Sequence, residues 1–130
     1  MFSAPKTSKS FTIAASLGAT EYWKKVSYDT VVSVTHDEMP TLIQEHDLGF
    51  SVWRNNLGIS LTSVASTKTA EFLACGRPVV INSLQGDFGV LIKEYNAGVV
   101  TSSDSEKDIE GYAKKILDLI KDKTTPKRCR

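Results

Sequence analysis

The sequence predicts an α/β fold, a three-layer sandwich with a mainly parallel sheet of about five strands. Short apolar runs alternate along the chain with amphipathic segments, which is typical of a parallel sheet covered by helices. The 130 residues, of which 41% are hydrophobic, fall in the size range of one globular domain with an ordinary core. One domain is therefore expected.

The apolar runs have the composition of buried strands. Several are rich in Val and Ile or continuously apolar, as strands buried on both faces are. We place strands at residues 11–15, 30–34, 48–53, 78–82 and 98–101.

The first helix is indicated by its start signals. Thr35 and Glu38 have the spacing of a capping box, and Asp37 is a competing N-cap residue. Pro40 is tolerated in a first turn. We therefore expect a short helix near residues 38–46.

The second helix is expected to begin near Ser66 and to span about residues 67–75. Gly76 can adopt the left-handed conformation that ends many helices, and Pro78 lies just beyond it. The residues before this helix, 55–65, are rich in Asn, Ser and Thr and read as a connection of the kind that closes over ligands.

Two more helices are predicted further along the chain. Asp87 can cap a helix that runs to about Tyr95, where Asn96 breaks it. Ser103 and Glu106 repeat the capping-box spacing before the last helix. One apolar stripe runs along this last helix, formed by Ile109, Tyr112, Ile116, Leu119 and Ile120.

The two ends of the chain are polar and are expected to be disordered. We assign residues 1–10 to a disordered N-terminus, residues 11–122 to the folded domain and residues 123–130 to a basic C-terminal tail.

Charge and cysteine content narrow the class of protein. The 16 basic and 15 acidic residues nearly cancel, which disfavours generic binding to nucleic acid. Two cysteines are too few for a disulfide framework, so a reducing, cytoplasmic setting fits best. The sequence lacks a secretory signal and an apolar run that spans a bilayer, so we expect a soluble protein. A peripheral position on the inner face of the membrane stays open.

The start of the Ser66 helix is the candidate site. Ligands of open α/β sheets bind beyond the carboxyl ends of the strands, where loops lead into helix N-termini. Unpaired amide groups and the helix dipole favour an anion there, and the side chains of Ser66, Thr67, Lys68 and Thr69 add hydroxyl groups and one cation. This set can hold a pyrophosphate. Glu71 lies on the same helix face, one turn further in, where a ribose attached to the pyrophosphate would reach it.

Other interpretations of these residues compete. Glu and Lys in the first turns of a helix are common surface residues, and the apolar residues of this helix, Cys75 included, are packing residues more often than reactive ones. No tight cluster of His, Cys and Asp has the spacing of a metal site.

The segment from Thr67 to Ile81 has at its centre the run Glu71-Phe72-Leu73-Ala74-Cys75-Gly76-Arg77-Pro78-Val79-Val80. This segment resembles the donor-site motif of group 1 glycosyltransferases, which are retaining enzymes of the GT-B fold. Two flanking segments are similar in order, His36-Asp37-Glu38-Met39-Pro40 and Tyr95-Asn96-Ala97-Gly98-Val99-Val100. The resemblance covers roughly residues 11–120 and implies a Rossmann-like domain, the C-terminal donor-binding half of that fold.

The resemblance implies that Glu71 holds the nucleotide ribose of a nucleotide-diphospho-sugar and that Ser66 to Lys68 support the pyrophosphate. Lys68 would stabilise the leaving diphosphate electrostatically, as the catalytic residue, with no metal or other cofactor. His36 stands where the family approaches the nucleobase, although a histidine at a helix start is more often a surface or capping residue. Arg54 could meet a phosphate at the same edge.

The chain departs from the family in two respects. The family's acidic motif has two glutamates separated by seven residues, and Ser63 replaces the first of them here. Nothing in this sequence corresponds to the acceptor domain of a GT-B enzyme, so the domain appears incomplete. A missing acceptor domain or a partner subunit is therefore an expected partner, and a homo-oligomer stays open.

Two functions follow as hypotheses. The first is the donor domain of a hexosyltransferase that transfers a sugar to a glycan or a lipid-linked acceptor in polysaccharide biosynthesis, with the isolated chain inactive. The second is a non-catalytic nucleotide-binding or protein-interaction module derived from the same fold. A nicotinamide-dependent enzyme and a phosphate-loop hydrolase are disfavoured because their glycine-rich loops are absent from the sequence.

Overall fold

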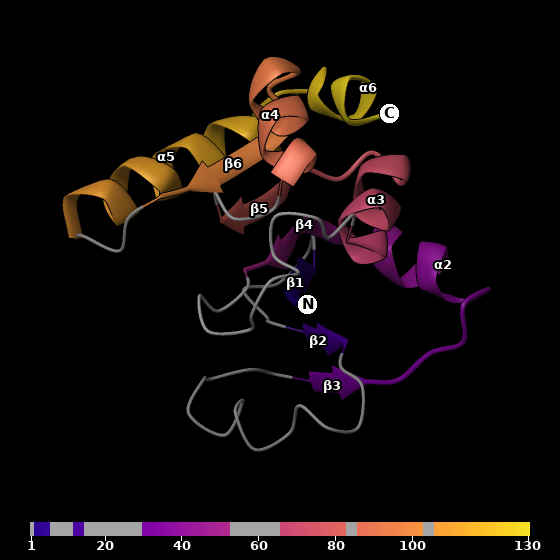
Figure 1. Cartoon of the computed structure of the whole chain (residues 1–130). Coiled ribbons are helices and arrows are strands. Elements are labelled where there is room, and N and C mark those ends of the chain that lie inside the picture. The colour runs from indigo at the N-terminus through magenta and orange to yellow at the C-terminus, as the bar shows by residue number, and fades with distance from the viewer. Residues whose placement is uncertain (1, 6–11, 15–29, 53–65, 83–85, 103–105) are drawn as a thin grey trace.

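The structure is a computed structural model that describes residues 2–5, 12–14, 30–52, 66–82, 86–102 and 106–130. Within these residues, six strands form one sheet in the order β3-β2-β1-β4-β5-β6 (Figure 1). The strands are β1 (Phe2–Pro5), β2 (Thr12–Ala14), β3 (Thr30–Val32), β4 (His46–Ser51), β5 (Val79–Asn82) and β6 (Gly98–Thr101).

The strands differ in direction. β4, β5 and β6 pair in parallel, with Gly49 beside Val79 and Val79 beside Gly98. β2 and β3 also pair in parallel. β1 is antiparallel to both of its neighbours, β2 and β4. β2 and β3 consequently run in the same direction as β4, and β1 alone among the described strands runs the opposite way.

This sheet confirms the predicted α/β class and corrects the prediction of a mainly parallel sheet of about five strands. The uninterrupted parallel part has three strands, β4 to β6, rather than about five, because β1 separates it from β2 and β3. The predicted disorder of residues 1–10 was wrong for Phe2–Pro5, whose backbone pairs with both neighbouring strands. Four residues that end in proline carry no periodic signal from which a strand could be predicted.

Helices cover both faces of the parallel strands. Figure 1 shows α2 and α3 on one side of the sheet and α5 on the other. In the part of the chain that the structure describes, no helix is long and apolar enough to cross a membrane. The helices of the two faces are α2 (Met39–Gln44), α3 (Thr67–Ala74), α4 (Gly86–Glu94) and α5 (Glu106–Lys121).

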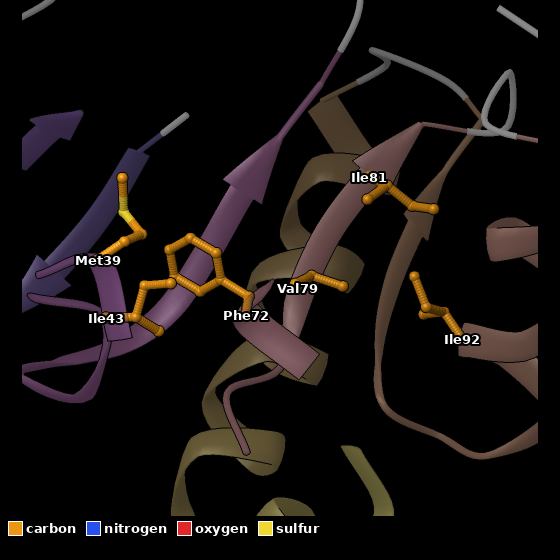
Figure 2. Packing of buried hydrophobic residues seen from close by; sticks show 6 residues of the cluster. All are labelled: Met39, Ile43, Phe72, Val79, Ile81 and Ile92. Carbon is orange, nitrogen blue, oxygen red and sulfur yellow. The ribbon is translucent and has the colours of Figure 1, made fainter. Parts of the chain in front are cut away.

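Two apolar clusters hold these layers together. Successive side chains of β5 point to opposite faces, so Val79 and Ile81 enter one cluster and Val80 enters the other. In the first cluster, shown in Figure 2, α2, α3 and α4 contribute Met39, Ile43, Phe72 and Ile92. In the second, Val99 of β6 and Leu119 of α5 pack against Val80.

The carboxyl end of α3 confirms the stop signal read from the sequence. Gly76 has a φ of 72°, a left-handed conformation that glycine adopts without strain. Its N–H donates to the carbonyl of Leu73 at 2.8 Å, and the N–H of Arg77 donates to the carbonyl of Phe72 at 2.9 Å. These two bonds form a Schellman motif and satisfy carbonyl groups that the helix leaves without partners. Asn96 ends α4 in the same way, with a φ of 50°.

A last helix, α6 (Thr125–Cys129), corrects the prediction of a disordered tail. Thr125 and Cys129 are buried, and the Cys129 thiol donates to the carbonyl of Ala97 at 3.7 Å. Arg128 pairs with Asp122 at 2.8 Å and donates to the carbonyl of Asn96 at 3.4 Å. These contacts attach the helix to the turn before β6. They involve residues far apart in the sequence, which explains why local composition indicated only a polar tail.

Candidate functional site

The candidate site lies at the edge of the sheet where the parallel strands end. α3 comes after β4, and the segment with His36 follows β3. Because β3 and β4 run in the same direction, both segments leave the sheet at its carboxyl edge. From β3 the chain continues to α2, which packs beside α3 (Figure 1). This path brings His36 to the amino-terminal half of α3.

The first turn of α3 has the geometry of a capped helix start. Ser66 is the N-cap residue, with φ −67° and ψ 109°, and its Oγ accepts a hydrogen bond from the N–H of Thr69 at 3.3 Å. Ala70 donates the first intrahelical bond, to the carbonyl of Ser66 at 3.1 Å. The amide groups of Thr67 and Lys68 come before these bonds and have no intrahelical carbonyl to reach. With the positive end of the dipole, they favour an anion.

Glu71 lies between two basic side chains, those of His36 and Lys68. Its Oε1 is 3.6 Å from Nδ1 of His36, and its Oε2 is 3.3 Å from Nζ of Lys68. The Glu71 side chain is only 18% exposed, whereas those of His36 and Lys68 are 84% and 48% exposed. The carboxylate is therefore the most buried of the three groups. The two basic side chains are exposed enough to move away from it without a loss of core packing.

One oxygen of this carboxylate has unused hydrogen-bonding capacity. Oε2 of Glu71 is buried and accepts no hydrogen bond from any group in the described residues. Its ion pair with Lys68, at 3.3 Å and partly exposed, supplies only screened attraction. An ionised carboxylate has about four acceptor positions, and buried polar atoms that lack partners are usually few. Two others occur in the described residues, Nε2 of His46 and Nε of Arg77, and both lie toward the amino ends of strands rather than at this edge. A ligand that donates hydroxyl groups here would fill this capacity.

The structure brings some of the predicted site residues together and gives others an internal role. Thr67 and Lys68 are exposed at the helix start, beside Glu71 and His36. By contrast, Ser66 is 5% exposed and acts as the cap.

A further predicted residue, Thr69, does not join the surface of the site, and the position of another is not described. Thr69 is fully buried, so the prediction that its hydroxyl adds to an anion site has no support from its position. Arg54, predicted to meet a phosphate, lies outside the described residues.

The pairing of His36 with Glu71 is the feature that sequence reasoning missed. Thr35 and Glu38 form only half of the predicted capping box: the Thr35 N–H and hydroxyl donate to Oε2 of Glu38 at 2.9 and 2.8 Å, whereas the Glu38 N–H donates to the Thr35 carbonyl. The N-cap residue of α2 is Glu38. The two bonds from Thr35 lower the pKa of the Glu38 carboxyl. This contact fixes the turn that carries His36, but the partner of His36 is on another element, and no local signal could identify it.

His46 is the other histidine of the chain and does not belong to this site. It is 3% exposed at the start of β4, at the opposite edge of the sheet, and its Nδ1 lies 2.7 Å from the carbonyl of Leu42. Its contact fastens the end of α2 to the first residue of β4, which is a structural role.

No group of three or more His, Cys, Asp or Glu side chains that could hold a metal occurs in the described ranges. The arrangement offers instead one carboxylate, one ammonium group, one imidazole and the amides of a helix start. Such a set can bind a phosphate group next to a hydroxylated group. Independence from metal stays a prediction.

Comparison of the chain with protein-family models, with curated proteins and with solved structures finds no match. Geometry and chemistry at the start of α3 therefore carry the functional conclusion.

Proposed function

We propose that the chain binds the nucleoside diphosphate part of a nucleotide-sugar at the start of α3, as the donor domain of a glycosyltransferase. The observation that carries this proposal is Glu71, whose buried Oε2 accepts no hydrogen bond within the described residues and lies one turn inside a helix start. The two ribose hydroxyls require a hydrogen-bond acceptor, and the diphosphate requires hydrogen-bond donors and positive charge. The start of α3 offers both within about one helical turn.

Each part of the ligand has a matching group. The amides of Thr67 and Lys68 would bind the pyrophosphate, with the Lys68 ammonium group beside them. Glu71, four residues after Thr67 and roughly 6 Å further along the helix axis, would accept hydrogen bonds from the two ribose hydroxyls. Lys68 would exchange its contact with Glu71 for one with phosphate. His36 is exposed and would give way to the ribose or border it.

The arrangement of the sheet supports this location. The strand order β3-β2-β1-β4-β5-β6 is that of doubly wound nucleotide-binding sheets, in which ligands lie at the carboxyl ends of strands where the direction of connection reverses. That point is between β1 and β4, and α3 follows β4. The reversed direction of β1 distinguishes this sheet from a regular doubly wound one. We infer a Rossmann-like domain with its ligand next to β4.

In sugar transfer, negative charge develops on the departing diphosphate. The oriented amides, together with Lys68 once its ammonium group has moved to the phosphate, would stabilise that charge, which is an electrostatic contribution to catalysis. The acceptor, a glycan or a lipid-linked sugar, would come from a second domain or subunit that faces this edge. The second candidate is a nucleotide-binding module without turnover. Ser63, in the place of the family's first carboxylate, favours it.

The binding proposal can be tested by calorimetry with ADP, GDP, UDP and dTDP, followed by the 2′,3′-dideoxy form of the best ribonucleotide. The wild-type chain should lose about tenfold in affinity for the dideoxy form, because hydrogen bonds to a charged group contribute about 1.5 kcal/mol or more. Glu71→Gln should bind the ribonucleotide about tenfold more weakly and should no longer distinguish it from the dideoxy form.

Glu94→Gln, at the far end of α4, is the matched control and should behave as wild type. The assignment of Glu71 fails if wild type and Glu71→Gln lose the same factor on removal of the hydroxyls. Lack of binding of every diphosphate would reject the site as a whole. With the acceptor domain supplied, transfer would distinguish the enzyme from the binding module.

A further inference from the structure

The apolar face of α5 is only half covered by the sheet. Leu119 is 3% exposed and belongs to the second cluster, with Tyr112 and Ile116 packed against it. Ile109, Leu117 and Ile120, on the adjoining side of the same helix, are 53%, 55% and 41% exposed. These three residues and Ala113 lie within about 80° of one another around the helix axis, so they form one stripe along the helix. We call this the α5 stripe.

Positive charge is concentrated in the same part of the chain. Residues 113–130 contain seven of the 16 basic and two of the 15 acidic residues, a net charge of +5. The other 112 residues contain nine basic and 13 acidic residues, a net charge of −4. The near-neutral total therefore conceals two regions of opposite sign, and the positive one begins within α5 and extends through α6.

The lysines border the α5 stripe. By helix periodicity, Lys114 and Lys121 lie beside Leu117, on the side that faces away from the sheet, and both are exposed. Glu110 is on the same border and offsets one of these charges. Lys123 and Lys127, also exposed, continue the positive charge beyond the end of the helix. Arg128 does not add to this surface, because it is tied to Asp122 and to the carbonyl of Asn96.

We propose that the α5 stripe and its bordering lysines form a docking surface for a membrane that contains anionic phospholipids. Exposed aliphatic side chains beside lysines match an interface in which acyl chains lie under negatively charged headgroups. Lysine stems cover apolar surface while the ammonium groups reach the headgroups. Leu117 and Ile120 would enter the acyl boundary, and Lys114, Lys121, Lys123 and Lys127 would contact phosphate groups.

The fold prepares this surface in advance. α5 is already folded and held to the sheet through Leu119, so membrane binding does not have to order a disordered segment. The opposite side of the helix stays packed during binding. Binding through three aliphatic side chains and a few lysines should be reversible and sensitive to salt, because charges at a surface are screened within about 8 Å at physiological ionic strength. A nucleic acid would use the lysines but gain nothing from the aliphatic stripe.

The test is sedimentation of the full chain with phosphatidylcholine vesicles that contain 0 or 30% phosphatidylglycerol, at low and high salt. We expect partition onto the anionic vesicles that falls at high salt, and little onto neutral ones. Lys114→Gln with Lys121→Gln should reduce the partition about 25-fold, since each lysine near an anionic surface contributes about fivefold. Leu117→Ser with Ile120→Ser should reduce it at least fivefold and weaken the part that survives at high salt.

Two exposed residues of α4 serve as matched controls. Val90→Ser with Lys93→Gln removes one aliphatic side chain, 64% exposed, and one lysine from another helix, and should leave the partition unchanged. All three variants replace exposed groups, so their melting temperatures should match wild type. Equal partition of wild type and the Leu117 and Ile120 variant would overturn the proposal, as would partition without preference for anionic lipid. Failure of the wild-type chain to bind any vesicle would also overturn it and would leave an acidic protein as the occupant. None of these results depends on nucleotide binding.

Discussion

The two ends of α3 differ in how far the backbone groups of the helix are satisfied. At the carboxyl end, Gly76 and Arg77 close the helix with two backbone bonds, and the Arg77 guanidinium donates to the carbonyl of Gln44 at 3.0 Å. At the amino end, a buried oxygen of Glu71 accepts no hydrogen bond from the described residues. The backbone of the helix is thus closed at its carboxyl end and open at its amino end. Each end also has one buried side-chain atom without a hydrogen-bond partner in the described residues, Nε of Arg77 and Oε2 of Glu71. Under the proposed function, the closed carboxyl end serves the fold and the open amino end binds the ligand.

The largest expected effect comes from a substitution in the turn that closes the carboxyl end of α3. Gly76→Ala places a side chain at a φ of 72°, which costs about 1–2 kcal/mol of unfolding free energy. The new Cβ would also lie 3.2 Å from Cβ of Pro126 in α6, so the docking of α6 should loosen. Chemical denaturation measures the first effect. Alkylation of Cys129 measures the second, because burial raises the pKa of this thiol to about 11 and keeps it unreactive while α6 is docked.

Gly111→Ala is the matched control for this prediction. Gly111 lies within α5, and a Cβ there would meet nothing within 4 Å. Alanine should stabilise the protein by about 0.5–1 kcal/mol through its higher helix propensity. The two variants should therefore change the free energy of unfolding in opposite directions. A Gly76→Ala variant as stable as wild type would show that the left-handed turn does not stabilise the carboxyl end of α3.

A smaller effect is expected at the open end. Lys68→Gln should weaken binding of a nucleoside diphosphate about three- to tenfold, because one charge-assisted contact is lost at a partly exposed position. The loss should shrink as salt is added. Lys93→Gln, in the last turn of α4, is the control. If Lys68→Gln binds as tightly as wild type at low salt, Lys68 serves only to balance Glu71. Stability should hardly change in either variant, in contrast to Gly76→Ala.

The smallest effect is a pH dependence of stability that comes from Asp122, between α5 and α6. Hydrogen bonds from Thr124, followed by the contact with Arg128, lower the pKa of Asp122 from 3.8 to about 2. Because the folded state has the lower pKa, the stabilisation is present above pH 4 and is lost as the pH falls toward 2. Thermal unfolding between pH 5 and pH 2 should therefore show a loss of stability that is weaker in Asp122→Asn. Parallel curves for the two proteins would exclude Asp122 as a contributor.

Sequence patterns predicted the elements whose causes are local. The ends of α3 and α4 follow from Gly76 and Asn96, whose conformations the structure confirms. The contact of Thr35 with the Glu38 side chain was predicted from its spacing and is present, although the N-cap residue of α2 is Glu38. The strand predicted at 98–101 coincides with β6. In each case the signal and the structure involve residues within a few positions of each other.

The features that the sequence did not reveal depend on distant residues. β1 forms because its backbone pairs with β2 and β4, and four residues contain no period from which to predict this. α6 depends on contacts of Cys129 with the turn at Ala97. In the candidate site, Glu71 and Lys68 could be placed on one helix face from their spacing. The approach of His36 could not, because it depends on the path of the chain from β3 to α2.

The position of β1 has a consequence for the order of folding. Phe2 pairs with Phe50, 48 residues away, and among the described strands β1 alone connects β2–β3 with β4–β6 in the sheet. Contacts across such long loops form late, because the chain must lose the entropy of loop closure before they stabilise it. We expect β4, β5, β6 and their helices to assemble first and β1 to complete the sheet in the final step. The half of the sheet that carries α3 would then be formed before the two halves are joined.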